Sequence, residues 1–214
     1  MGMMKQRSAV ILSAVPVTPA MRRYLSEEDF VVACDAGYRN APILGVQPQL
    51  IVGDFDSAPQ PTDQKDLVVL PHIKDDTDTH YAARWLVEQG FRQITMLGAL
   101  GGERMEHTLA NLSTGLYLAK AGCTVCLADE TSELHYLLPG QTLTLARGDW
   151  NYLSVFPLEG ALQGVTLQGL FYPLQDATLT ADHPLGVSNE FAAPQAKLMC
   201  TAGCGLVVLT RCEA

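Results

Sequence analysis

The pattern of hydrophobic and polar positions changes once along the chain, near residue 130. Before that point, short runs that are apolar throughout alternate with segments of helical periodicity or of turn-forming residues. In the segment 78–90, Tyr81, Trp85 and Leu86 are the apolar positions of a helical pattern, and Gly90 ends it. Apolar strands separated by helices predict a parallel α/β sheet. The expected strands are 8–15, 30–35, 49–54, 66–71, 93–99 and 124–129; helices are expected at 19–25, 78–90 and 104–122, and a helix or turn at 38–45.

From Glu133 on, the apolar runs become short and alternate with polar residues, as in QTLTLA and NYLSVFP, and Gly, Pro and Asp separate them. No helical period is evident there. The pattern is typical of a small antiparallel domain, either a sandwich or a barrel. We therefore expect an α/β fold in which an N-terminal parallel-sheet (Rossmann-like) domain, residues 1–132, is followed by a small all-β sandwich domain, residues 133–214. The junction is expected within DETSELHYLLPG.

The composition of the 214 residues, 48% hydrophobic and 17% charged, is enough to bury a proper core. The net charge of −9 repels nucleic acid and anionic lipid, so neither is expected as a partner. The apolar run near the start is interpreted as a first strand rather than a signal peptide. No apolar stretch approaches the roughly 20 residues that a membrane span needs. We expect a cytoplasmic protein.

Six cysteines are expected to be reduced in that compartment. Cys123 and Cys126, together with Cys200 and Cys204, allow a hypothetical site of four zinc ligands. However, CTVCLAD has the pattern of a strand, in which residues three apart point to opposite faces. We therefore favour small buried hydrophobic residues over a zinc site.

Acidic residues gather where the predicted parallel strands end. Asp35 ends one strand, and Asp54 and Asp56 end another as LIVGDFDS. Ligands of an open parallel sheet bind outside the carboxyl ends of its strands. In an extended backbone Asp54 and Asp56 point to the same side, about 6–7 Å apart. Such crowding is unfavourable unless a cation shares the site, and Mg2+ prefers carboxylate oxygen. Further acids near this edge are Asp75, Asp76, Asp78 and Glu106, although Asp75 or Asp76, taken alone, fits a helix cap better than a ligand.

A second informative stretch is LGALGGERMEHTLANL, in which glycines follow a strand and precede a helix. Glycines allow the backbone to approach phosphates, and the start of the following helix attracts anions. Arg104 and His107 add cationic or hydrogen-bonding groups. His107 and Asn111 are four residues apart and so share one face of the helix.

These stretches together resemble the thiamine pyrophosphokinase (thiamine diphosphokinase) family. The motifs that carry the resemblance occur in family order and cover most of the chain: CDAG (34–37), GDFDS (53–57), KDDTD (74–78), GALGGERMEHTLAN (98–111), GLFYPL (169–174) and GVSNEF (186–191). The resemblance implies transfer of a pyrophosphoryl group from ATP to the hydroxyethyl oxygen of thiamine. It also implies an α/β catalytic domain followed by a β-sandwich, Mg2+ as the metal, and a homodimer with shared active sites.

Carried over by position, the resemblance assigns catalysis and Mg2+ binding to Asp54, Asp56 and Asp78. The set expected to bind ATP and thiamine is Asp35, Lys74, Asp75, Thr77, Arg104, His107, Asn111, Tyr172, Ser188 and Asn189. Within it, Ser188 and Asn189 would bind thiamine, and Tyr172 occupies an aromatic position suited to stacking on its rings. Lys74 and Arg104, with Arg39 as a further candidate, would supply positive charge. Asp56 and Asp78 are alternative acceptors of the hydroxyl proton.

The sequence departs from the family pattern at three places. Ala36 replaces a glycine, Glu106 stands in a longer loop where an Asp is expected, and the loop LSAVPVTP lacks the Gly-rich turn of many members. Two other functions are consistent with parts of the pattern. A strand that ends in Asp-x-Asp also occurs in phosphatases that form an aspartyl-phosphate. A thiamine-binding module with a decayed catalytic site is the non-enzymatic alternative.

Overall fold

The computed structural model describes residues 6–54, 67–69 and 76–212. Two compact units make up the chain, Met1–Glu130 and Thr131–Ala214. Each is described here by itself. Asp56, Lys74 and Asp75 of the predicted site lie outside the described residues.

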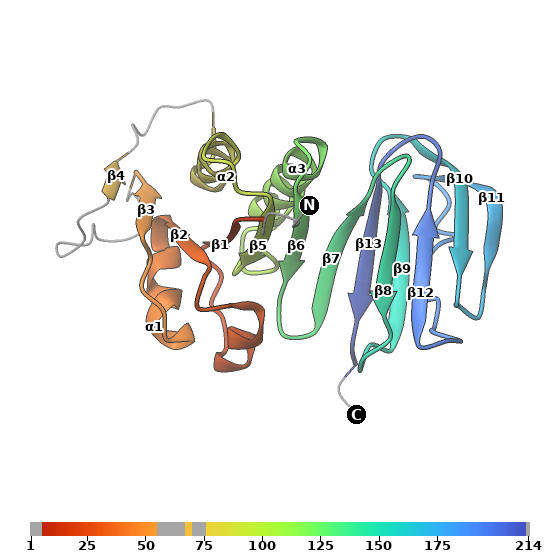
Figure 1. The fold of residues 1–214 in the computed structure, drawn as a ribbon, viewed down its shortest axis with the longest axis horizontal. Coiled ribbons are helices and arrows are strands. Elements are labelled where there is room, and N and C mark those ends of the chain that lie inside the picture. The colour runs from red at the N-terminus through yellow and green to blue at the C-terminus, as the bar shows by residue number, and fades with distance from the viewer. Residues whose placement is uncertain (1–5, 55–66, 70–75, 213–214) are drawn as a thin grey trace, which may run out of the picture. The chain divides into compact units, whose positions relative to one another are not determined.

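The first unit is built on a parallel sheet, as the apolar strands predict. Its strands follow the order β4-β3-β2-β1-β5-β6, and every neighbouring pair is parallel. Figure 1 shows these strands with their helices. The α/β class and the parallel sheet are thus confirmed. The strand bounds are β1 Ser8–Leu12, β2 Phe30–Cys34, β3 Leu50–Gly53, β4 Leu67–Val69, β5 Gln93–Leu97 and β6 Thr124–Ala128.

The strand order reverses between β1 and β5. From β1 the chain moves outward through β2 and β3 to β4, and it then returns to place β5 and β6 on the other side of β1. At such a reversal the connections leave the two central strands in opposite directions, and a crevice opens beyond their carboxyl ends. The geometry of the sheet therefore predicts where the ligand site of this unit lies.

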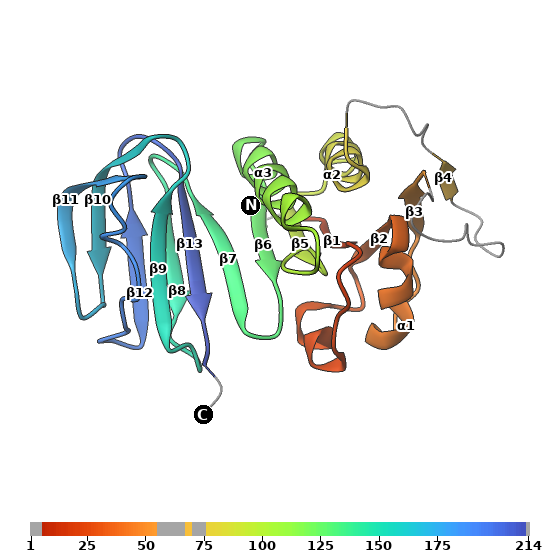
Figure 2. The same ribbon diagram turned by 180° about the vertical axis from the view of Figure 1, so that it is seen from behind.

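The helices of this unit are α1 Asn40–Leu44, α2 Asp78–Glu88 and α3 Met105–Lys120, with 3₁₀ helices η1 Pro19–Tyr24 and η2 Asp35–Arg39. The cap of α2 is Thr77, whose hydroxyl accepts a hydrogen bond from the backbone N–H of His80 at 3.1 Å. Helices α2 and α3 contact each other and lie side by side in Figures 1 and 2. No helix among the described residues is long and apolar enough to cross a bilayer.

The core of the first unit follows from the alternation of its strands. In β1, Val10 and Leu12 face a buried cluster that includes Met21 of η1 and Leu44 of α1. Helix α2 contacts β1, β2 and β3, and its buried Ala82 and Ala83 have side chains small enough for close approach. Each large aliphatic side chain buried in this way stabilises the fold by about 1.5–3 kcal/mol.

The second unit consists of antiparallel strands. β13 pairs with β7 and β9, and a further sheet has the order β11-β10-β12-β8. Both groups of strands contribute to one hydrophobic cluster, for example through Leu153 and Val207 from the first and Leu162 and Leu198 from the second. The bounds are β7 Ser132–Leu137, β8 Thr142–Ala146, β9 Tyr152–Pro157, β10 Ala161–Gln168, β11 Leu174–Thr180, β12 Gln195–Met199 and β13 Gly205–Thr210.

Strand β7 is the element that the sequence pattern did not predict. The segment was interpreted as the junction between the domains, because Glu133 and His135 interrupt its apolar run. In the structure these two residues are half-buried, while Leu134 and Tyr136 are buried. The alternation is therefore present, but only over a few residues.

Gly37 fixes how closely η2 approaches the end of β1. A Cβ atom on this residue would lie 2.1 Å from the carbonyl oxygen of Leu12 and 2.8 Å from its carbonyl carbon. Both are backbone atoms that cannot rotate away. Ala36, by contrast, carries its methyl group on the wall of a pocket. Of the two neighbouring positions, only 37 requires a glycine for steric reasons.

We predict that Gly37→Ala lowers the free energy of unfolding by roughly 3 kcal/mol, because the added methyl group forces backbone apart. Urea denaturation of the whole chain measures this. Ala36→Gly is the matched control and is expected to cost about 1 kcal/mol or less. Equal midpoints for Gly37→Ala and wild type would show that η2 does not approach β1 as described.

Candidate active site

A pocket of about 560 Å3 lies at the predicted edge of the parallel sheet in the first unit. This volume falls within the range of ligand sites in proteins, about 300–1,000 Å3. The walls come from the segments that follow β1, β2, β3 and β5, and from the first turns of α2 and α3. The lining residues used below are Ser13–Pro16, Cys34, Asp35, Ala36, Asp54, Thr77, Asp78, Thr79, Gly98, Gly101, Gly102, Arg104, His107 and Asn111.

Three aspartates from separate elements reach this pocket. Asp35 follows β2, Asp54 follows β3, and Asp78 begins α2. All three side chains are half-buried. Asp35 has a φ of 46°, a left-handed conformation that few residues other than glycine adopt and that occurs often at functional sites. The structure thus brings Asp35, Asp54 and Asp78 together. Asp76, which pairs with Arg84, and Glu106 were expected near this edge but are not among the lining residues.

Two helices begin at the pocket. Thr77, Asp78 and Thr79 of the start of α2 line it, as do Arg104 and His107 of the start of α3. The first N–H groups of a helix lack partners within the helix, and the helix dipole adds positive potential there. Thr77, predicted to bind the nucleotide, uses its hydroxyl as the α2 cap. Two helix starts beside three carboxylates make a site with both anion-binding and cation-binding groups.

The glycine-rich loop between β5 and α3 has the conformation that its sequence indicates. Gly98, Gly101 and Gly102 have φ values of 64°, 75° and 82°. A Cβ on Gly98 would lie within 2.6 Å of the carbonyl oxygens of Ser13 and Val15, so only glycine fits there. Asn111, predicted from the sequence as a binding residue, is buried and donates to the carbonyl oxygen of Ala99 at 2.8 Å. This hydrogen bond ties α3 to the loop that follows β5.

Arg104 pairs with the residue that departs from the family pattern. Its Nε donates to Glu106 at 2.8 Å, and both side chains are about two-thirds exposed. The hydrogen bond from Arg104 lowers the pKa of the Glu106 carboxyl below its ordinary value. The Glu106 side chain reaches back along the loop to Arg104. His107, one residue further on, is exposed and lines the pocket.

Cys34 is a pocket residue that sequence reasoning missed. Its side chain is buried, and its Sγ donates to the backbone oxygen of Asp78 at 3.7 Å. Burial raises the pKa of this thiol far above its ordinary value, and the charge of Asp78 raises it further. Cys34 is therefore a neutral thiol at physiological pH. Cys34 lines the pocket together with the three aspartates.

The loop Ser13–Pro16 was also missed as part of the site. It lacks the glycine-rich turn of many family members, so no motif in the sequence marks it as a binding segment. The observation that could have found it is its place directly after β1, at the carboxyl end of a central parallel strand. Thr79, likewise missed, has its hydroxyl 3.4 Å from the hydroxyl of Ser13.

The remaining predicted residues belong to the second unit. Tyr172 is 70% exposed. Asn189 is buried; its Nδ2 donates to the carbonyl oxygen of Tyr172 at 2.7 Å, and its Oδ1 accepts from the N–H of Tyr172 at 3.0 Å. Ser188 has a φ of 58°, and its N–H donates to the hydroxyl of Ser154 at 3.0 Å. Asn189 thus holds the segment that presents the exposed Tyr172 ring.

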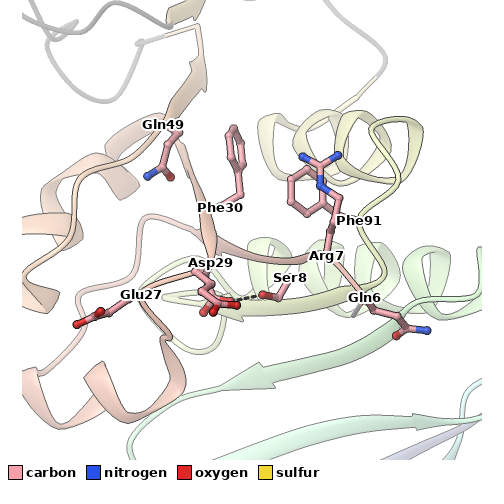
Figure 3. A pocket seen from close by; sticks show the side chains of 9 residues that line it. Gln6, Arg7, Ser8, Glu27, Asp29, Phe30, Gln49 and Phe91 are labelled. Atoms are coloured by element: carbon pink, nitrogen blue, oxygen red, sulfur yellow. Dashed lines mark hydrogen bonds between the residues drawn. The ribbon is translucent and has the colours of Figure 1, made fainter. Parts of the chain in front are cut away.

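Another hollow of about 410 Å3 lies at the start of β1 and β2 (Figure 3). Its polar side chains bond to neighbouring parts of the fold. Asp29 accepts from the Ser8 hydroxyl and from the N–H of Ser26, and Gln49 accepts from the N–H of Val31 at 2.6 Å. Arg7 donates to a backbone oxygen and lies over the Phe91 ring. These groups shape the strand starts, and the site chemistry lies at the opposite edge.

Family models match both parts of the chain. Residues 21–127 match "Thiamin pyrophosphokinase, catalytic domain", and residues 140–205 match "Thiamin pyrophosphokinase, vitamin B1 binding domain". The chain belongs to the thiamin pyrophosphokinase family. This confirms the resemblance seen in the sequence motifs. The family consists of ATP-dependent transferases that transfer pyrophosphate to thiamine, and the chain is such an enzyme.

Individual members of the thiamin pyrophosphokinase family are similar to this chain over most of their length. Thiamine pyrophosphokinase of Bacillus subtilis is 27% identical over 178 residues, which are 80% of this chain and 83% of the relative. The crystal structure of thiamin pyrophosphokinase from Geobacillus thermodenitrificans has a TM-score of 0.85 at 28% identity, covering 96% of this chain and 98% of that one. The Bacillus subtilis crystal structure has a TM-score of 0.87 at 23% identity, covering 97% and 100%.

We predict that iodoacetamide at pH 8 modifies Cys212 and spares Cys34 in the native protein. Cys212 is exposed, whereas Cys34 is buried and its raised pKa keeps it a thiol, which is not the reactive form. Peptide mass mapping measures both sites. In urea the two should react at similar rates. Native labelling of Cys34 as fast as that of Cys212 would contradict the protonated, buried state.

Proposed function

We propose that the pocket of the first unit binds ATP with Mg2+ and transfers its pyrophosphoryl group to the hydroxyethyl oxygen of thiamine. The observation that carries this proposal is the convergence of Asp35, Asp54 and Asp78 with two helix starts in one pocket. Carboxylates alone repel a triphosphate, and helix starts alone offer no metal ligand. The combination suits a triphosphate that carries a divalent cation.

The residues of the pocket fit Mg2+ by their chemistry. The acidic side chains that line it offer oxygen ligands. Asp54 and Asp78 would hold the ion, together with Asp56, which lies outside the described residues. When bound, the metal would neutralise phosphate charge during transfer. Mg2+ usually takes one or two carboxylates and leaves further positions to phosphate oxygens and water.

The phosphates would be held by backbone and by cationic side chains. The glycine loop before α3 allows close approach, and the starts of α2 and α3 present N–H groups and positive potential. Arg104 and His107 line the same side of the pocket. Lys74, outside the described residues, is a further candidate. Arg39, the other candidate, is an exposed surface residue whose guanidinium lies over the Tyr38 ring.

The chemical step needs a proton acceptor and precise placement. The alcohol oxygen of thiamine attacks the β-phosphorus of ATP and forms the new P–O bond. The bond between the β-phosphorus and the oxygen that bridges it to the α-phosphorus breaks, and AMP leaves with that oxygen. The alcohol proton passes to a carboxylate, for which Asp78 and Asp56 are the candidates. Most of the rate enhancement would come from positioning and charge neutralisation.

Thiamine would meet the second unit through Tyr172 and Ser188. The exposed Tyr172 ring offers an aromatic face to a cationic ligand. Asn189 would contribute by holding that ring in place, since its side-chain amide already bonds to the backbone of Tyr172. Pre-positioning the ring reduces the entropy that binding must overcome.

A homodimer with shared active sites belongs to the same proposal. Exposed apolar side chains support it: Met105 and Leu109 on α3 are 64% and 57% exposed, and Phe171 and Leu185 in the second unit are 63% and 55% exposed. Apolar groups of this size near predicted binding residues are typical of surfaces that a partner covers.

A cytoplasmic location fits the six free cysteines.

Asp54→Asn and Asp78→Asn are each expected to lower thiamine diphosphate formation by about 100-fold or more, because a neutral amide cannot replace a metal-binding carboxylate. Formation of AMP and thiamine diphosphate from ATP measures this, and thiamine binding by calorimetry should persist. Glu88→Gln, on the exposed end of α2, is the matched control and should retain activity.

The assay also separates the alternatives. Phosphate release without thiamine would indicate an aspartyl-phosphate phosphatase, and thiamine binding without turnover would indicate a decayed module. Undiminished turnover in Asp54→Asn would remove that residue from the site.

Shared sites predict complementation between two impaired variants. Tyr172→Ala should raise the KM for thiamine by about 2- to 30-fold, because a cation–π contact contributes about 0.5–2 kcal/mol. Mixed with Asp54→Asn after subunit exchange, it should restore about one quarter of the wild-type sites, since half of the dimers are mixed and each holds one intact site. Activity at low thiamine measures this. No gain over the separate variants, in a protein that light scattering shows to be dimeric, would mean that each site is built from one chain.

A further inference from the structure

We propose that Asn40 is a positioning residue that sets the β1 wall of the pocket, the segment Ser13–Val17, for nucleotide binding. The inference rests on the proposed function of that pocket. This wall contains no glycine, yet it lies where a parallel sheet places its ligand contacts. Without a glycine-rich turn, contacts with other parts of the fold must fix the shape of this wall.

Asn40 begins α1, and its side-chain amide bonds three times to the wall. Nδ2 donates to the carbonyl oxygens of Ser13 at 2.8 Å and Val15 at 2.9 Å, and Oδ1 accepts from the N–H of Val17 at 3.3 Å. Two carbonyl partners require the NH2 group and one N–H partner requires the oxygen, so the partners fix the orientation of the amide. Asn40 is 3% exposed, which makes each lost bond costly.

The end of β5 also holds the wall, through two backbone hydrogen bonds. The N–H of Ser13 donates to the carbonyl oxygen of Leu97 at 2.8 Å, and that of Val15 donates to Gly98 at 3.0 Å. A Cβ on Gly98 would meet Asn40 Nδ2 at 3.0 Å as well as the two wall carbonyls. The amide of Asn40 and the end of β5 therefore both bond to the backbone of the wall.

Val15 carries this fixed position to the glycine-rich loop. Its Cγ2 would lie 3.0 Å from a Cβ on Gly102, so the valine packs directly against that loop. Gly102 precedes Arg104 and the start of α3, where phosphate binding is proposed. A shift of the wall would therefore alter the separation of the two loops that line the pocket.

Asn40 acts through the wall and not on the substrate. It does not belong to the residues that line the pocket, and both N–H groups and the oxygen of its amide are engaged. Loss of the amide should consequently weaken ATP binding more than it slows the chemical step. Thiamine, whose proposed contacts are in the second unit, should be affected least.

The test compares Asn40→Asp and Asn40→Ala with wild type. Asn40→Asp keeps size and the acceptor for Val17 but turns an oxygen toward the two carbonyls, whereas Asn40→Ala removes all three bonds. We expect the KM for ATP to rise about 10-fold or more, the KM for thiamine to change less than about 2-fold, and kcat to change less than about 3-fold. Amide hydrogen exchange at Val17 should accelerate in Asn40→Ala, which removes the acceptor of that N–H, and less in Asn40→Asp, which keeps it.

The matched control is Thr114→Val. Thr114 is 1% exposed and bonds to His80 Nδ1 at 3.2 Å between α3 and α2, and neither residue lines the pocket. It should lower the melting temperature as the Asn40 variants do, without raising the KM for ATP. An equal rise in the control, or an unchanged KM for ATP when Val17 exchanges faster, would overturn the proposal and leave Asn40 a purely structural residue.

Two further measurements keep the outcome decisive. If neither Asn40 variant folds, Val15→Ala leaves the three bonds in place and shortens a side chain that packs against Gly102 and lines the pocket. A several-fold higher KM for ATP is expected, and no change overturns the proposal. If the wild type forms no thiamine diphosphate, the proposed function fails. Calorimetry of ATP with Mg2+ then still shows whether the Asn40 variants bind nucleotide more weakly.

Discussion

The reversal of strand order between β1 and β5 is the constraint on which the site of this protein depends. Parallel strands deliver their carboxyl ends to one edge, and the reversal separates the connections that follow the two central strands. The pocket is lined by the segments that follow β1, β2, β3 and β5 and by the first turns of α2 and α3. The sheet therefore sets the position of the chemistry before any individual side chain contributes.

Groups of opposite charge meet at this edge of the sheet. Carboxylates from β2, β3 and α2 repel one another in a half-buried setting, and helix starts add positive potential beside them. Arg104 and Glu106 pair with each other at the rim, so the rim itself adds little net charge. Cys34 lines the same pocket as a buried, protonated thiol.

Local patterns in the sequence were enough to predict much of this arrangement. Asp35 and Asp54 directly follow apolar strands, and the parallel-sheet rule then brings them together. Asn40 and Cys34 could not be found in the same way. The role of Asn40 arises from contacts with residues more than twenty positions away in the chain, and that of Cys34 from burial against α2. Strand β7 was missed because its few alternating residues resembled a linker. Such features depend on tertiary packing, which periodicity does not encode.

The contrast between positions 36 and 37 has a consequence for how this family diverges. Where a doublet of glycines is expected, this chain retains only the second, which the Leu12 carbonyl leaves no room to replace. The first glycine of the doublet is thus open to drift, and a methyl group there merely narrows the cavity. A distant homologue that lacks the second glycine would need a displaced η2, and with it a rearranged pocket.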